Sequence, residues 1–165
     1  MAKNWYFVEP YSGEQQIEAT STTQNHALGH TVQARHATYG VATFIYLKGV
    51  ANTAAYDVVV FDLKAGTTTR AVSGSPGSRG PAAVAMSANV ANQYGWYMIE
   101  GSAIITCGTV AADKPLYATA TPGTVDDAVV SGDMILGMVS KTANGTPAAG
   151  QLVAQIARPC MSGLG

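Results

Sequence analysis

The sequence predicts an all-β protein: a single β-sandwich or barrel-like domain of many short antiparallel strands, with an extended N-terminal arm. Short runs rich in β-branched and aromatic residues recur along the 165-residue chain. Glycine, proline and asparagine interrupt these runs at short intervals, which is typical of closely spaced strands joined by turns. No segment has a strong helical pattern. The length suits one domain with a core of its own.

The arm is expected to comprise residues 1–27. Pro10 restricts the residue before it to extended backbone, and the polar stretch 11–25 that follows has no strand pattern. Aromatic and apolar side chains gather near its start, at Trp5, Tyr6, Phe7 and Val8. This group either reaches a groove on a neighbouring molecule or folds back on its own domain, and the sequence leaves both arrangements open.

The β-rich domain is expected to comprise residues 28–165. Residues 31–36 and 41–48 are predicted strands because β-branched and aromatic residues are enriched there. The apolar run 56–63 is too short for a helix and fits a strand buried on both faces. The glycine- and proline-rich segment 73–81 is predicted to be an internal loop.

After this loop, turn residues separate a series of short predicted strands, as in sandwiches and barrels. They cover residues 84–90, 94–100, 103–110, 116–121, 124–130, 134–140 and 151–158. The run 94–100 contains Tyr94, Trp96 and Tyr97. In a half-buried strand, alternate members of this group face the core and the outside. An outward ring could anchor a protein contact or stack on a sugar.

Charged residues make up only 12% of the chain, compared with about 25% in an average soluble domain, and the formal net charge is -1. The absence of a basic field disfavours binding to nucleic acid or to a membrane surface. No apolar run approaches about 18 residues, and the N-terminus lacks a signal-peptide core, so we expect the chain to stay in the cytoplasm that makes it. The uncharged surface suits a protein covered by partners, or a small stable β-domain.

Residues with reactive side chains are few. His26 and His30 have a metal-like spacing only on a helix, which Gly29 disfavours. Cys107 lies in a strand pattern, and its distance from Cys160 suggests two free thiols rather than a metal site or a disulfide. Asp126, Asp127 and Asp133 lack the spacing of a calcium loop. We therefore predict no catalytic residue, metal site or cofactor, and no enzymatic activity.

Several segments together resemble small structural proteins encoded in the head modules of tailed phages, namely capsid decoration or cement proteins. The resemblance covers about residues 28–158 and is carried by segments 44–52, 80–86, 93–97, 116–120 and 126–130. It implies a structural virion protein on the outer capsid surface, which bridges neighbouring subunits of the major capsid protein, often as a homotrimer.

On this interpretation, residues 28–165 bind the capsid, and the partners are the major capsid protein and other copies of this chain. The candidate assembly contacts are Trp5, Tyr6, Phe7, Val8, Tyr94, Trp96 and Tyr97. The alternative is a carbohydrate- or receptor-binding module of a head fibre or tail, which would use Tyr94, Trp96 or Tyr97 to stack on its ligand.

Overall fold

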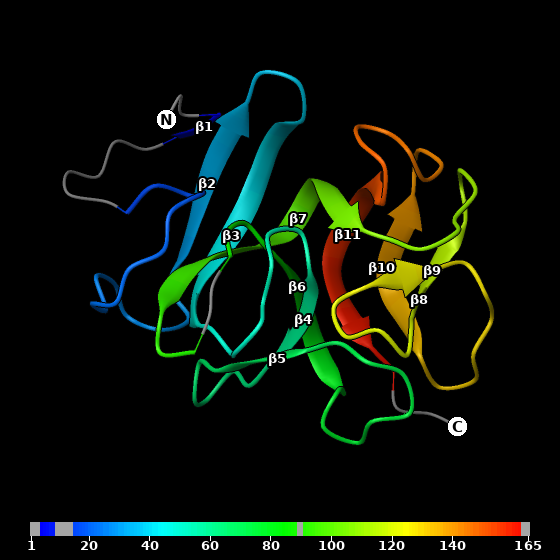
Figure 1. Cartoon of the computed structure of the whole chain (residues 1–165). Coiled ribbons are helices and arrows are strands. Elements are labelled where there is room, and N and C mark those ends of the chain that lie inside the picture. The colour runs from blue at the N-terminus through cyan, green and yellow to red at the C-terminus, as the bar shows by residue number, and fades with distance from the viewer. Residues whose placement is uncertain (1–3, 9–14, 89–90, 163–165) are drawn as a thin grey trace.

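The structure, a computed structural model, describes residues 4–8, 15–88 and 91–162 (Figure 1). These residues form β-strands, turns and loops and contain no helix, so the predicted all-β class is confirmed. The strands are β1 (Trp5–Phe7), β2 (Thr31–His36), β3 (Gly40–Lys48), β4 (Val58–Phe61), β5 (Thr68–Arg70), β6 (Gly80–Ala85), β7 (Tyr94–Thr106), β8 (Pro115–Ala118), β9 (Val125–Asp126), β10 (Met134–Ser140) and β11 (Gln151–Met161).

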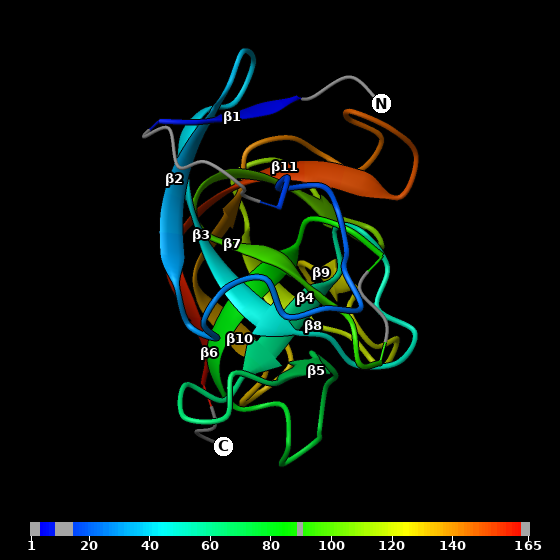
Figure 2. The same cartoon turned by 90° about the vertical axis from the view of Figure 1, so that its left-hand side faces the viewer.

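All eleven strands belong to one antiparallel sheet, in the order β1-β2-β3-β7-β6-β11-β10-β8-β9, with β4 paired to β6 and β5 paired to β4. Two isolated parallel bridges, Lys48–Thr67 and Cys107–Val125, join distant parts of this sheet. The first closes a ring of β3, β7, β6, β4 and β5, and the second closes a ring of β7, β11, β10, β8 and β9. The sheet therefore curves back on itself in a barrel-like form, and β7 belongs to both rings (Figure 2).

The core has two parts, one on each face of strands β3, β4, β6 and β7. The smaller cluster lies inside the first ring and consists of Ile45, Leu47, Val59, Phe61, Ala83, Ala85, Tyr97 and Ile99. The alternate residues of the same strands, including Tyr46, Val60 and Trp96, face the larger cluster. These strands are consequently buried on both faces, which explains why their sequences are continuous apolar runs. The predicted two-faced burial of residues 56–63 is confirmed for β4, whose four residues are all buried.

Strand bounds agree with expectation for β2 and β10 and differ elsewhere. The two strands predicted over 94–100 and 103–110 form one strand, β7, because Gly101 adopts a φ of +126° that lets the pairing continue. The predicted loop 73–81 ends earlier, since β6 begins at Gly80, and the predicted strand 124–130 shortens to β9. The strand β5, which has three residues, was not predicted from the sequence.

The described residues of the expected N-terminal arm, 4–8 and 15–27, lie against the rest of the chain. β1 pairs antiparallel with β2, and the buried Trp5 ring meets the Phe44 ring edge-on at a centroid distance of 5.0 Å. Gln15 and Ile17 are also buried. Residues 9–14 of the arm lie outside the described part of the chain. Of the two arrangements left open by the sequence, the described residues adopt the one that folds back on the same chain.

Candidate functional site

The structure places three of the seven predicted assembly contacts, Trp5, Trp96 and Tyr97, in the core, and two more, Phe7 and Tyr94, pack against it. Trp96 and Tyr97 are fully buried on opposite faces of β7, so the expectation that one of them points outward from a half-buried strand is wrong. Trp5 is buried and Phe7 is half-buried, with its ring 6.2 Å from that of Trp96. The larger core cluster covers the face of β7 that carries Trp96, and the smaller cluster covers the face that carries Tyr97.

Gln15 forms hydrogen bonds to three aromatic residues of this region. The Trp96 indole N–H donates to the Gln15 carbonyl at 2.8 Å, and the Tyr46 hydroxyl donates to the Gln15 side-chain oxygen at 2.8 Å. The Gln15 amide in turn donates to the Tyr94 carbonyl at 2.9 Å. Tyr94 and Trp96 therefore hold residues 15–27 in place, and Tyr94, Trp96 and Tyr97 do not form an exposed stacking platform.

Tyr6 and Val8 are the predicted contacts that remain exposed. Tyr6 pairs with Arg35 across β1 and β2, and Arg35 pairs with Val41 across β2 and β3, so these three residues are neighbours on one outer face. Tyr6 is 62% and Val41 is 52% exposed. We call Tyr6, Arg35 and Val41 the N-terminal surface.

A second exposed apolar group, not anticipated from the sequence, lies on β10 and β11. Leu136, which is 49% exposed, stands opposite the exposed Cys160, and Val139 stands opposite the exposed Gln155. We call these four residues the β10 surface. The bulge at Gly137 shifts the register between Leu136 and Met138 and leaves both Leu136 and Val139 outward. Strict alternation of inward and outward side chains would have placed Leu136 and Val139, which are three positions apart, on opposite faces of β10.

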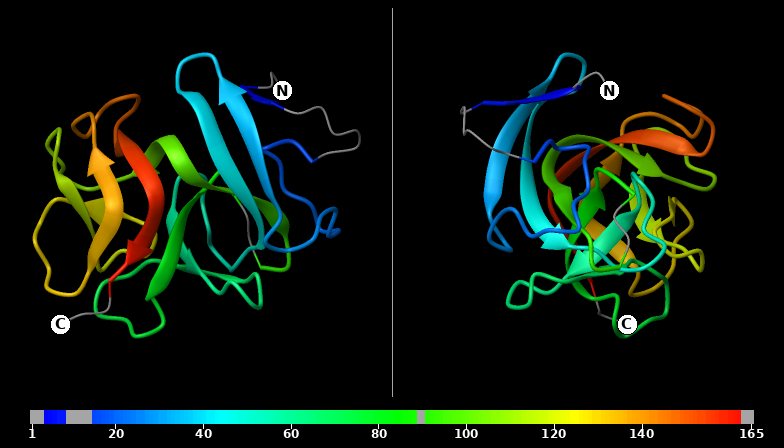
Figure 3. Two further views of the ribbon diagram at one scale, coloured as in Figure 1. Left: turned by 180° about the vertical axis from the view of Figure 1, so that it is seen from behind. Right: turned by 60° about the vertical axis from the view of Figure 1, so that its left-hand side comes forward.

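The two surfaces lie far apart in the molecule. β1, β2 and β3 stand at one end, and β8, β9 and β10 stand at the other, in the front view and in the view from behind (Figures 1 and 3). Both surfaces are parts of the same continuous sheet, which fixes their relative position. One molecule can therefore present apolar contacts in two directions.

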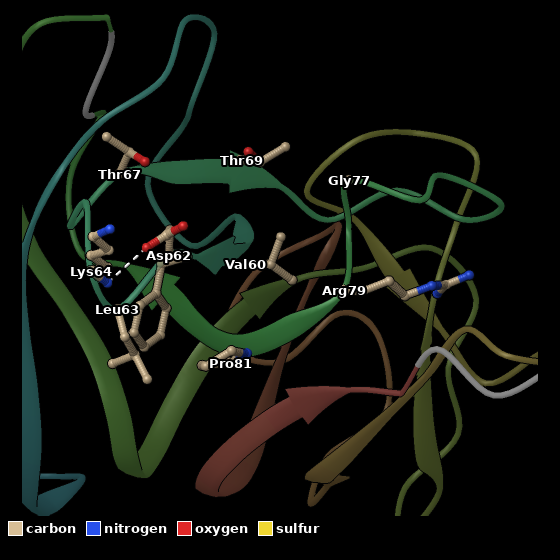
Figure 4. Close-up of a pocket in the computed structure, with 10 residues that line it drawn as sticks. Val60, Asp62, Leu63, Lys64, Thr67, Thr69, Gly77, Arg79 and Pro81 are labelled. Carbon is tan, nitrogen blue, oxygen red and sulfur yellow. Dashed lines mark hydrogen bonds between the residues drawn. The ribbon is translucent and has the colours of Figure 1, made fainter.

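A cavity of about 630 Å³ opens between the β4–β5 turn and the 73–80 loop (Figure 4). Two of its charged side chains, Asp62 and Arg79, are already engaged. Asp62 accepts hydrogen bonds from the Lys64 and Ala65 backbone, and Arg79 forms an ion pair with the buried Asp133 at 2.8 Å. Figure 4 shows the Arg79 side chain directed away from the other lining residues. This cavity presents no group poised for catalysis.

Burial is the main cause of each pKa shift among the described side chains. Burial raises the pKa of the Cys107 thiol, which keeps it protonated, and burial also raises the pKa of Asp126. Burial lowers the pKa of His26, and the charge of the nearby His30 lowers it further. The two histidine rings lie 5.9 Å apart. Within the described residues, no group of three or more histidine, cysteine, aspartate or glutamate side chains could hold a metal ion.

Comparison of the chain with family models, with curated proteins and with solved structures finds no match. Among the described residues there is also no helix that could cross a membrane. The exposed surfaces and the sequence resemblance are therefore the features that bear on function.

Proposed function

We propose that this protein is a structural virion protein, which decorates the outer surface of a phage capsid and stabilises it by bridging neighbouring major capsid protein subunits. The observation that carries the proposal is the pair of exposed surfaces with apolar side chains at opposite ends of one continuous sheet. The resemblance of several segments to phage cement proteins points the same way. We further propose that the protein assembles as a homotrimer.

A bridging protein needs contacts in at least two directions and needs little chemistry. Each surface here is small, but a symmetric shell repeats it many times, and linked contacts strengthen one another through effective concentration. The low charge of the chain also favours this role, because charged side chains are depleted from the cores of protein interfaces.

The decisive experiment measures the copy number of this chain relative to the major capsid protein in gradient-purified particles, by quantitative mass spectrometry. Decoration predicts near-stoichiometric abundance. A few copies per particle would instead favour a fibre or tail component, and absence from the particles would refute a virion role.

Deletion of residues 1–10 would be a poor test of capsid attachment. It would remove β1 and the buried Trp5 ring, and loss of a buried tryptophan side chain typically costs about 3–5 kcal/mol. Weaker attachment could then reflect a damaged fold. Substitution of exposed residues such as Tyr6 separates attachment from folding.

A further inference from the structure

Two adjoining cavities lie beside β1 and the turn that precedes β4, away from the β10 surface. Their volumes are about 250 and 730 Å³. They share the lining residues Asn4, Glu18, Tyr56 and Met86, so one groove leads into the other. We call this pair of cavities the Tyr56 groove.

The smaller cavity gathers hydrogen-bond acceptors. Glu18 forms no ion pair within the described residues and accepts one long hydrogen bond, from the Asn4 backbone N–H at 3.4 Å. Glu18, Tyr39 and Tyr56 all line this cavity. Burial raises the pKa of Tyr56, and the nearby Glu18 and Tyr39 raise it further. The groove thus offers a carboxylate and two phenol oxygens, and His36, which lines the same cavity, forms no ion pair with Glu18.

Two further features mark the groove as a site that is incomplete in the isolated chain. The Ser87 hydroxyl, in the wall of the larger cavity, is the one buried side-chain polar atom of the described residues without a hydrogen-bond partner. Tyr56 has a φ of +72°, which is strained for a tyrosine, and backbone bonds to Ala85 and Thr106 hold it there. Such strain concentrates at ligand sites.

We propose that the Tyr56 groove receives an arginine side chain of a partner protein. The larger cavity provides apolar wall at Met86 and Ala19 for the aliphatic stem. The guanidinium donates to the Glu18 carboxylate and to the phenol oxygens, and the tyrosine rings favour its planar cation. Arginine fits better than lysine because its fork of donors can serve several acceptors at once. The inference rests on the proposed function in one respect, namely that the major capsid protein supplies the arginine.

The test is an NMR titration of the full chain with N-acetyl-arginine amide. N-acetyl-citrulline amide is the uncharged analogue of the same shape. We expect the arginine compound to shift the signals of Tyr39 and Tyr56 and to bind at least about tenfold more tightly than the citrulline compound.

The Glu18→Gln variant should lose this preference for the arginine compound. Asp113→Asn removes an equal charge from an exposed site and should keep it. Equal binding of the arginine and citrulline compounds, or equal binding of N-acetyl-lysine amide, would overturn the proposal.

Capsid binding by the same variants separates this inference from the proposed function. If both hold, Glu18→Gln occupies particles less than Asp113→Asn does. If the unmodified chain occupies particles but does not prefer the arginine compound, the groove assignment fails while decoration stands. If the arginine preference is present but the chain is absent from particles, decoration fails and the groove remains. Unchanged occupancy for Glu18→Gln would refute the capsid protein as the source of the arginine.

Discussion

His26 couples the N-terminal segment to the core, and its environment favours the uncharged ring. Its Nε2 atom accepts a hydrogen bond from the Gln15 backbone N–H at 3.4 Å, so the proton sits on Nδ1. The ring also lies 5.2 Å from that of Trp96. Protonation would place a charge in this half-buried position and remove the acceptor that Gln15 uses.

This environment predicts a pH-dependent stability. Because the pKa of His26 is lower in the folded chain than the ordinary value of about 6.5, the unfolded chain binds more protons below that pH. The free energy of unfolding should therefore be insensitive to His26 above about pH 6.5, fall as the pH decreases from there toward the folded pKa, and level off below it, with uptake of at most one proton on unfolding. Urea denaturation across pH 5 to 8 measures this slope.

The His26→Asn variant should lose this component of the slope, whatever its overall stability. His30→Asn is the informative companion, because it removes the weaker cause of the shift and leaves the burial of His26. It should retain part of the slope. An identical slope for His26→Asn and the unmodified chain would contradict the assignment.

At the level of single residues, the sequence predicted which side chains are unusual but not where they point. Trp96 and Tyr97 stood out as candidates for contact, yet a core cluster lies on each face of β7 and buries both side chains. Burial of this kind depends on strand partners distant in sequence, which local patterns do not reveal. The single buried glutamine that organises the N-terminal segment, Gln15, likewise carries no local signal.

Among the strands, β7 determines the architecture, because it belongs to both rings. It passes between them at Gly101, where a Cβ atom would lie 2.7 Å from the Ala42 Cβ on β3. The φ of +126° at this position is also one that residues with side chains rarely adopt. The close approach of β3 and the bend of β7 therefore both need glycine here.

We predict that Gly101→Ala destabilises the fold by about 2–5 kcal/mol, the sum of the backbone penalty and of overpacking against Ala42. Gly40→Ala is the matched control. Gly40 has a φ of +77° but open space around its Cα atom, so only the backbone penalty of about 1–2 kcal/mol applies. Chemical denaturation of both variants measures the difference, and an equal loss would show that the contact with Ala42 is unimportant.

Local pattern predicted the bounds of β2 and β10 correctly. It failed where a glycine with positive φ continued a strand that the pattern had broken, at Gly101. It also failed for β5, whose three residues lack an apolar run and which owes its position to pairing with β4. The strand order and the two closing bridges depend on long-range pairing and could not be read from the sequence.

For the whole molecule, the relative placement of the two exposed surfaces matters more than either surface alone. The N-terminal surface and the β10 surface are joined through β2, β3, β7 and β11, all parts of one hydrogen-bonded sheet. A rigid connection loses little conformational freedom when both ends bind, so linked contacts reinforce each other. A bridging protein with a flexible connection would lose part of this advantage.

Capsid attachment should therefore depend on both ends independently. We predict that Tyr6→Ser and Leu136→Ser each weaken binding to empty capsid shells by about tenfold, since burial of one large apolar side chain contributes about 1.5–3 kcal/mol. The double variant should multiply the two losses, because the sites are far apart and share no partners. Sedimentation of the purified variants with shells that lack the protein measures the bound fraction.

Leu63→Ser is the control for nonspecific loss of surface hydrophobicity, because Leu63 is 70% exposed and belongs to neither surface. It should bind as the unmodified chain does, and thermal melts should show all four variants folded. If one single substitution weakens binding as much as the double variant does, only one end contacts the shell. The chain would then sit on a single subunit rather than bridge two, and the stabilising role would have to arise from contacts between copies of the chain.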